Sequence, residues 1–319
     1  IMKYSESNTA PDRVDKLFSP LGSDSSPVVV GWIVYDWANS VTVIPYLMLI
    51  PLLINELGDE EFGKGAGKIM WSYVSVVMAV ITAILYMSVT ALIEFGHNKR
   101  IFLMTCGRGA ALLLILFIFA FTPGSVYLAA ILVVCSVCSH RIAGVAYDSL
   151  LDAIALGKDA HQISSRGQAT GYLAMIAFLC SIAPILGIIY VAAKPNTIWL
   201  FYLLPTCLAG LWYLLFLIIV AKRLPPQVYT GQPLPDNLRG NWVYMAVVGG
   251  YAGFIEQLLT IKSLYYFPDL ALYIIGTALI ADGGAAATSA AVIIASDVIG
   301  LSFIYIGAGA VLGLSSAAV

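Results

Sequence analysis

The stretch GWIVYDWANS (residues 31–40) places Asp36 and Asn39 inside an apolar run that is long enough to cross a membrane. Asp36, Asn39 and Ser40 are spaced at i, i+3 and i+4, so a helix presents all three on one face. Because a charge at the centre of a bilayer costs about 3 kcal/mol on insertion scales, such a face normally points into a bundle or a wet cavity. The stretch therefore predicts a membrane-spanning helix with one polar face turned away from lipid.

The composition of the 319 residues supports this interpretation. Hydrophobic residues make up 60% of the chain, charged residues make up 11%, and the mean hydropathy is +0.91. Soluble domains carry about 25% charged residues, so we expect an all-α integral membrane protein. Residues 1–27 are polar and contain no apolar core of a cleavable signal, which predicts a disordered cytoplasmic tail. Because the chain starts at Ile1 and its last residues are apolar, we expect a piece of a longer protein.

A helix needs about 20 mainly apolar residues to span the hydrocarbon core. Apolar runs of this kind fall at residues 28–54, 69–92, 101–121, 126–147, 168–191, 198–220, 270–294 and 302–319. Lys and Arg are concentrated in the segments on the side of the N-terminal tail. By the positive-inside rule, that side is the cytoplasm.

The polar segment KRLPPQVYTGQPLPDNLRG (222–240) divides these spans into two groups. Residues 241–266 follow it with a short uncharged stretch that runs into Glu256 and Lys262. This pattern favours an interfacial helix on the cytoplasmic face, and a further span is the alternative. We therefore expect a tail at 1–27, a six-helix half at 28–221, a linker with an interfacial helix at 222–268, and the first two helices of a second, incomplete half at 269–319.

Six spans, a linker and further spans form the layout of a transporter built from two six-helix halves. In such parallel repeats the first and seventh spans occupy equivalent places. Asp36 and Asp282 lie at similar depths in these two spans, roughly 12–18 Å from the cytoplasmic end at 1.5 Å per residue. The layout predicts that both carboxylates look into one central cavity.

GWIVYDWANS also resembles the first-helix signature of the autophagy-related vacuolar amino-acid effluxer family, a branch of the major facilitator superfamily. Later segments of the chain are similar to later motifs of that family and superfamily, in the same order: ALIEFGHNKR (91–100), AYDSLLDAIA (146–155), ISSRGQATGYLAMI (163–176) and LIADGGAAATSAAVIIASDVIGLS (279–302). The resemblance covers nearly all of residues 28–319. It implies a bundle of the major-facilitator type, a vacuolar membrane location, and export of amino acids from the vacuole lumen to the cytosol.

Asp36 is either a proton carrier or the partner of a substrate ammonium group. The alternative is a hydrogen-bonded clamp between helices, in which Asn39 and Ser40 take part. Asp282 and Gly283 combine a carboxylate with a helix-weakening glycine, which favours a place on the transport path over close helix packing.

Arg141 lies within an apolar run and needs an anionic partner. Asp148 is seven residues further on and on nearly the same helix face, so an ion pair with Asp148 or with Asp36 is expected. A substrate carboxylate is the alternative partner.

Glu94, Gly96, Lys99 and Arg100 form a basic turn between the second and third spans. The resemblance implies that this loop holds the two halves together on the cytoplasmic side when the carrier faces outward. The alternative is a positive-inside anchor.

Other classes of function have little support. GKGAGK (63–68) lacks the Gly-Lys-Ser/Thr ending of a P-loop, so we expect no ATP and no other cofactor. Cys135, Cys138 and His140 cannot share one helix face at 100° per residue, so we expect no metal site. With all histidines placed at or near membrane ends, we expect no enzyme activity.

The expected partners are the lipid bilayer and a small solute, with amino acids first, and no nucleic acid. The alternatives are a carrier for another small metabolite or ion, and a membrane scaffold or receptor without transport.

Overall fold

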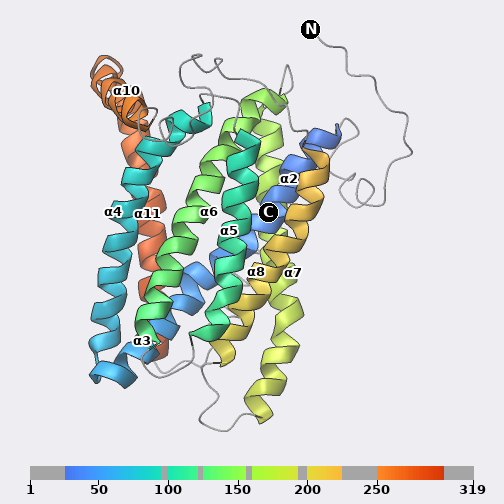
Figure 1. Ribbon diagram of the computed structural model, residues 1–319, viewed down its shortest axis with the longest axis vertical. Helices are drawn as coiled ribbons and strands as arrows, with labels where there is room; N and C mark the ends of the chain where they lie inside the picture. The colour runs from blue at the N-terminus through green and yellow to red at the C-terminus, as the bar shows by residue number, and fades with distance from the viewer. Residues whose placement is uncertain are drawn as a thin grey trace.

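The computed structural model describes residues 26–94, 99–120, 125–155, 160–192, 200–224 and 250–297. Every regular element in these ranges is a helix (Figure 1). The long helices are α2 (Pro27–Asn39), α3 (Ile50–Phe62), α4 (Ala66–Glu94), α5 (Lys99–Leu116), α6 (Val126–Ala155), α7 (Ala160–Ala192), α8 (Leu200–Arg223), α10 (Gly250–Ser263) and α11 (Pro268–Asp297). The prediction of an all-α membrane bundle is confirmed.

Six helical segments among the described residues are long and apolar enough to cross a membrane. They are Pro27–Phe62, Ala66–Tyr86, Lys99–Phe119, Val126–Ala155, Ala160–Ile189 and Leu200–Arg223. These segments run alternately up and down, so α2 begins and α8 ends at the same end of the bundle (Figure 1). Each overlaps one of the first six predicted spans, but α6 continues to Ala155 and α7 begins at Ala160. A helix can extend beyond the apolar core because its backbone hydrogen bonds are internal.

The first span changes helix type twice along its length. α2 is followed by a 3-10 turn, η2 (Ser40–Thr42), and by a π turn, η3 (Pro45–Leu49), before α3 begins. Pro45 has no N–H to donate to the preceding turn, and the Ile50 N–H bonds to the Pro45 carbonyl in the wider π pattern. Such irregular turns are frequent at functional sites. The opening motif therefore ends where the helix changes geometry.

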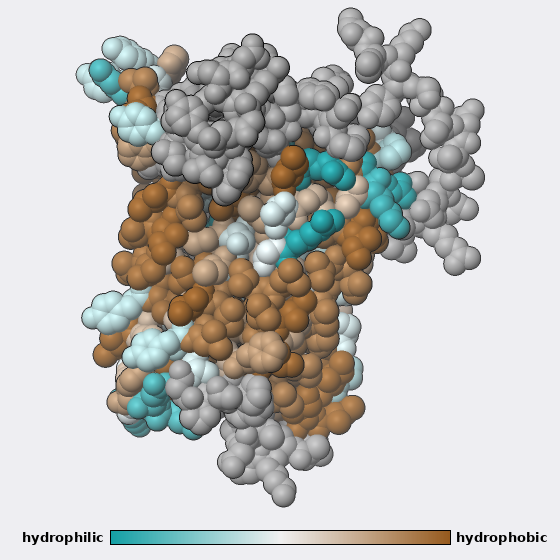
Figure 2. Space-filling model, viewed as in Figure 1, coloured by the Kyte–Doolittle hydropathy of each residue, from teal (hydrophilic) through white to brown (hydrophobic). Residues whose placement is uncertain are grey.

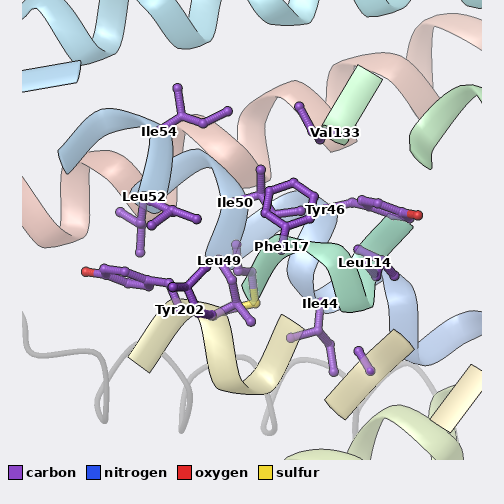
Figure 3. Close-up of a cluster of buried hydrophobic side chains, with 14 of the residues drawn as sticks. Ile44, Tyr46, Leu49, Ile50, Leu52, Ile54, Leu114, Phe117, Val133 and Tyr202 are labelled. Atoms are coloured by element: carbon purple, nitrogen blue, oxygen red, sulfur yellow. The ribbon is translucent and has the colours of Figure 1, made fainter. Parts of the chain in front are cut away.

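Two hydrophobic clusters fill the bundle, one in each half of its length. The cluster at the end where α3 and α4 meet, here called the outer cluster, includes Ile44, Leu49, Ile50, Leu114, Phe117 and Tyr202 (Figure 3). The cluster at the end where α2 begins, here called the inner cluster, includes Val34, Tyr35, Leu103, Tyr147 and Leu217. Because lipid tails are as apolar as these side chains, their association in a membrane rests on close packing. The boundary between the clusters falls between Ala38 and Val41 of the first span.

Glycine permits close approach at two helix crossings. A Cβ on Gly210 of α8 would lie 2.7 Å from the Ala111 carbonyl oxygen of α5. A Cβ on Gly67 of α4 would overlap the Asn55 carbonyl of α3. Small residues at such positions let the backbones of membrane helices pack against each other.

The sequence GKGAGK forms the turn that begins α4. Gly63 and Gly65 have φ values of 97° and 91°, which favour glycine. The Asp59 carboxylate accepts hydrogen bonds from the backbone N–H groups of Gly65 at 3.0 Å and Gly67 at 2.8 Å. These bonds satisfy donors that a helix start leaves unpaired.

α10 and α11 lie beside the six-span bundle. α10 has 14 residues, contacts α4, and lies at the end of the bundle where α2 begins (Figure 1). α11 contacts η3 and α3 of the first span. Figure 2 shows hydrophobic residues over most of the middle of the visible face, as expected for a surface in contact with lipid.

Candidate functional site

Asp36 and Ser40 of the first span face two glycines of α7. A Cβ on Gly167 would lie 2.5 Å from Asp36 Oδ2, and a Cβ on Gly171 would overlap the Ser40 hydroxyl. The two glycines are four residues apart, a spacing that lets membrane helices pack closely. Asp36, Asn39 and Ser40 are half-buried, so their common face lies at a helix contact. The Asn39 Oδ1 atom is buried and has no hydrogen-bond partner among the described residues.

Two aromatic residues of α2 hold Tyr147 of α6 beside Asp36. The ring centroids of Trp32 and Tyr35 lie 4.3 and 4.6 Å from that of Tyr147, both in stacked arrangements. Trp32 Nε1 donates a hydrogen bond of 3.2 Å to the Tyr147 carbonyl. The Tyr147 hydroxyl and the Asp36 carboxylate both lie next to Gly167. Tyr147 could not be singled out from the sequence, because a tyrosine in an apolar helix has no distinctive spacing signal.

Two charged residues of opposite sign, Arg141 and Asp148, also lie on α6. Asp148 follows Tyr147 and interacts electrostatically with Asp36. The side chains of Arg141 and Asp148 are exposed on the surface of the described residues. Within the described ranges Arg141 forms no ion pair with Asp148 or Asp36, although an ion pair was expected. Arg141 therefore presents its guanidinium group in the middle of a 30-residue helix without an anionic partner from this part of the chain.

A layer of polar contacts joins the first span to α6 and α8 near the boundary between the two hydrophobic clusters. The Tyr35 and Tyr213 hydroxyls lie 2.9 Å apart. Thr42 Oγ1 lies 3.2 Å from His140 Nδ1 and donates to the Asn39 carbonyl at 2.7 Å. The layer connects α2, α6 and α8.

The sequence predicts that His140 lies near a membrane end. Because α6 extends to Ala155, His140 lies in the middle of that helix. The predicted span 126–147 stops before Asp148, whereas α6 continues to Ala155, so the centre of the helix lies further along the chain than the prediction places it. The position of His140 along α6 follows only from the full length of the helix.

Lys99 and Arg100, the two cations of the basic turn, are the first residues of α5 and donate hydrogen bonds to α6 and to the end of α8. Lys99 Nζ donates a 2.8 Å hydrogen bond to the Ser149 carbonyl of α6, and its side chain is buried. Arg100 donates from Nε to the Leu224 carbonyl and from Nη2 to the Ala221 carbonyl, both at 2.9 Å. Gly96 and the Glu94 side chain lie outside the described residues. The described contacts join parts of one six-helix group.

The second predicted carboxylate, Asp282, lies at the middle of α11. Its side chain is outside the described part of the structure, so the paired arrangement with Asp36 stays a prediction. The neighbouring Gly283 is exposed, and nothing lies within 4 Å of a Cβ built on it.

Comparison with known proteins places the chain in a family. The model of the family described as "Vacuole effluxer Atg22 like" matches residues 152–319. Autophagy-related protein 22 of Yarrowia lipolytica is 30% identical over 156 residues, which cover 44% of this chain and 24% of that relative. No solved structure matches the chain. With its spanning helices, the chain is a multi-pass vacuolar membrane protein, and it belongs to the vacuole effluxer Atg22-like family.

Proposed function

We propose that the protein is a secondary transporter that exports amino acids from the vacuole lumen to the cytosol, with the proton gradient as its energy source. Membership of a family described as vacuole effluxers supports the transport class. The match covers 24% of the length of the Yarrowia lipolytica relative, so the activity of the whole protein is part of the proposal. The six-span bundle is the N-terminal half of a carrier of the major-facilitator type, and α11 begins the second half.

The observation that carries the proposal is the set of ionisable groups on two neighbouring membrane-spanning helices. α2 supplies Asp36, and α6 supplies Arg141 and Asp148. Ionisable side chains inside membranes are rare and mark solute or proton pathways. Arg141 has no ion-pair partner among the described residues, which leaves its planar fork available for a carboxylate. Asp36 and Asp148 carry the opposite sign and suit the ammonium group of a zwitterionic amino acid.

Asp36 and its helix neighbours have distinct roles in this proposal. Ser40 packs against Gly171 and acts as the clamp between α2 and α7. Asp36 lies at the same contact with α7 and also interacts electrostatically with Asp148. Protonation of Asp36 therefore changes the net charge of the transport path. Asp282 and Gly283 supply the equivalent position in the second half. Asn39 lies on the same helix face as Asp36, and its Oδ1 atom can accept a hydrogen bond from the solute.

The test uses the full-length protein in vesicles with an imposed pH gradient and a panel of labelled amino acids, other metabolites and ions. Arg141→Gln is expected to raise KM for amino acids about tenfold or more, because the lost interaction is a charge-assisted hydrogen bond. Arg108→Gln is the matched control, since Arg108 is also an exposed arginine within a span but lies on α5.

Each outcome assigns a function. Transport of another solute in the panel replaces the amino-acid class. No transport of any solute overturns the carrier proposal in favour of a scaffold or receptor. An equal KM for the wild type and Arg141→Gln removes Arg141 from solute binding.

A further inference from the structure

Tyr147 is fixed more firmly than an ordinary packing tyrosine. Its ring is stacked between those of Trp32 and Tyr35, and its carbonyl accepts the Trp32 indole N–H. The residue is buried, with a relative exposure of 6%. Both constraints come from α2, the helix that carries Asp36. The position of the Tyr147 hydroxyl is therefore set relative to Asp36.

The Tyr147 hydroxyl is buried beside a carboxylate without a completed hydrogen bond. It lies near Asp36 and interacts with it electrostatically. The hydroxyl and the carboxylate approach closely enough for a side-chain hydrogen-bond interaction, but the pair does not meet the full geometry of a hydrogen bond, and this hydroxyl has no other partner among the described residues. A buried hydroxyl without a partner is costly. Contacts of this kind are often long in the resting protein and tighten in the working state.

Gly167 of α7 closes the same small space. A Cβ at this position would lie 2.5 Å from Asp36 Oδ2 and 3.3 Å from the Tyr147 hydroxyl. The carboxylate therefore occupies the volume that an alanine side chain would need. Glycine at residue 167 leaves Asp36 room to approach Tyr147.

We propose that Tyr147 is a positioning residue for Asp36, and that its hydroxyl donates a hydrogen bond to the Asp36 carboxylate when that group is ionised. Gly167 provides the space in which this bond forms. The inference rests on the proposed transport function, because it concerns the same carboxylate. Its consequence is that α6 and α7 together set the orientation and the ionisation of a group on α2.

The groups that face Asp36 decide in which direction the loss of the Tyr147 hydroxyl shifts the ionisation of Asp36. On α6 they are Tyr147 and Asp148, on α2 the neighbour is Tyr35, and α7 offers Gly167 at the contact. Tyr147 is the hydroxyl that the geometry places beside the carboxylate. Its removal disfavours the ionised form, so Asp36 should stay protonated to higher pH.

The first experiment measures this ionisation directly, without transport. Infrared difference spectra of the purified full-length protein follow the protonated carboxyl band that Asp36→Asn removes. In Tyr147→Phe the midpoint of this band should move about one pH unit upward, since a hydrogen bond to a charged group is worth roughly tenfold or more. Tyr213→Phe is the control, because it removes a buried hydroxyl whose partner is Tyr35. Equal midpoints in Tyr147→Phe and wild type would overturn the inference.

The second experiment reads the same property in transport. Tyr147→Phe should shift the pH profile of uptake in the same direction, and Tyr213→Phe should keep the wild-type profile. Gly167→Ala should also alter the profile, whereas Gly187→Ala on the same helix should not, because nothing lies within 4 Å of a Cβ on Gly187. An unaltered profile in both Tyr147→Phe and Gly167→Ala would overturn the positioning role. A wild type that transports nothing refutes the proposed function alone, and the infrared midpoints still judge the inference.

Discussion

The hydroxyl groups of Tyr35 and Tyr213 lie 2.9 Å apart and join α2 to α8 inside the bundle. Both side chains are fully buried. Tyr35→Phe or Tyr213→Phe alone leaves the other hydroxyl without this partner, which should lower the free energy of unfolding by about 1–3 kcal/mol. Replacing both removes the donor and the acceptor together, so the double variant should lose less than the sum of the single losses.

The measurement is the unfolding midpoint of the purified full-length protein in a denaturing detergent titration. The four proteins of the cycle differ by two oxygen atoms, so other packing is preserved. Strictly additive losses would show that the hydrogen bond does not couple the two helices.

Arg100 provides a second prediction, on the basic turn. Its guanidinium group donates to two carbonyls at the C-terminal end of α8, where a helix leaves acceptors unpaired and favours positive charge. Arg100→Gln should therefore lower thermal stability by about 1–3 kcal/mol, the value of hydrogen bonds from a charged donor. Arg100→Lys should restore only part of the loss, because a lysine cannot form the same two-pronged contact.

The control for this pair is Arg108→Gln, which removes an exposed arginine from α5 itself. If Arg100→Gln keeps full stability and loses transport, the turn acts as a gate between halves. If Arg100→Gln lowers the stability of the protein, the main role of Arg100 is to hold the end of α8 through the two hydrogen bonds.

Asp59 leads to a third prediction, at the turn between α3 and α4. Its carboxylate accepts from the N–H groups of Gly65 and Gly67. Asp59→Ala should cost about 0.5–2 kcal/mol, as the loss of an N-terminal cap does. Glu60→Ala is the matched control, because Glu60 is exposed on the same helix. Equal unfolding midpoints for the two variants would contradict the capping role.

The helical bundle could be predicted because apolar length is a strong signal in a membrane protein. The first six predicted spans each overlap an observed spanning segment. The ends of α6 and α7 could not be predicted in the same way, because helix formation continues where the apolar core stops. The change of helix type after Asn39 also has only a weak sequence signal, the proline at residue 45.

The candidate site could be predicted in part, from charge inside apolar runs. This rule found Asp36 and Arg141, since each is expensive in lipid. It gave no information on Tyr147 or Gly167, because a tyrosine and a glycine carry no such cost. Their place beside Asp36 follows from a contact between helices that lie far apart in the sequence.

The last prediction concerns Thr42, where the first span meets His140. The Thr42 hydroxyl donates its one proton to the Asn39 carbonyl and therefore accepts from the Nδ1–H of His140. Thr170 is a matched threonine on α7: it is also buried, and its hydroxyl bonds to the Arg166 carbonyl of its own helix. Substitution by valine preserves the shape of both side chains and removes the hydroxyl. Only the Thr42 variant breaks a bond between helices.

Thr42→Val should therefore destabilise the protein by about 0.6–1.7 kcal/mol more than Thr170→Val, the range for hydrogen bonds between membrane helices. Thr42→Ser keeps the hydroxyl and should recover most of this difference. Denaturing detergent titrations of the full-length protein provide the comparison. In a His140→Phe background the excess cost of Thr42→Val should vanish, since the ring no longer offers an Nδ1–H to satisfy. An excess that persists in that background would place its origin in the irregular backbone of η2 instead of the bond to His140.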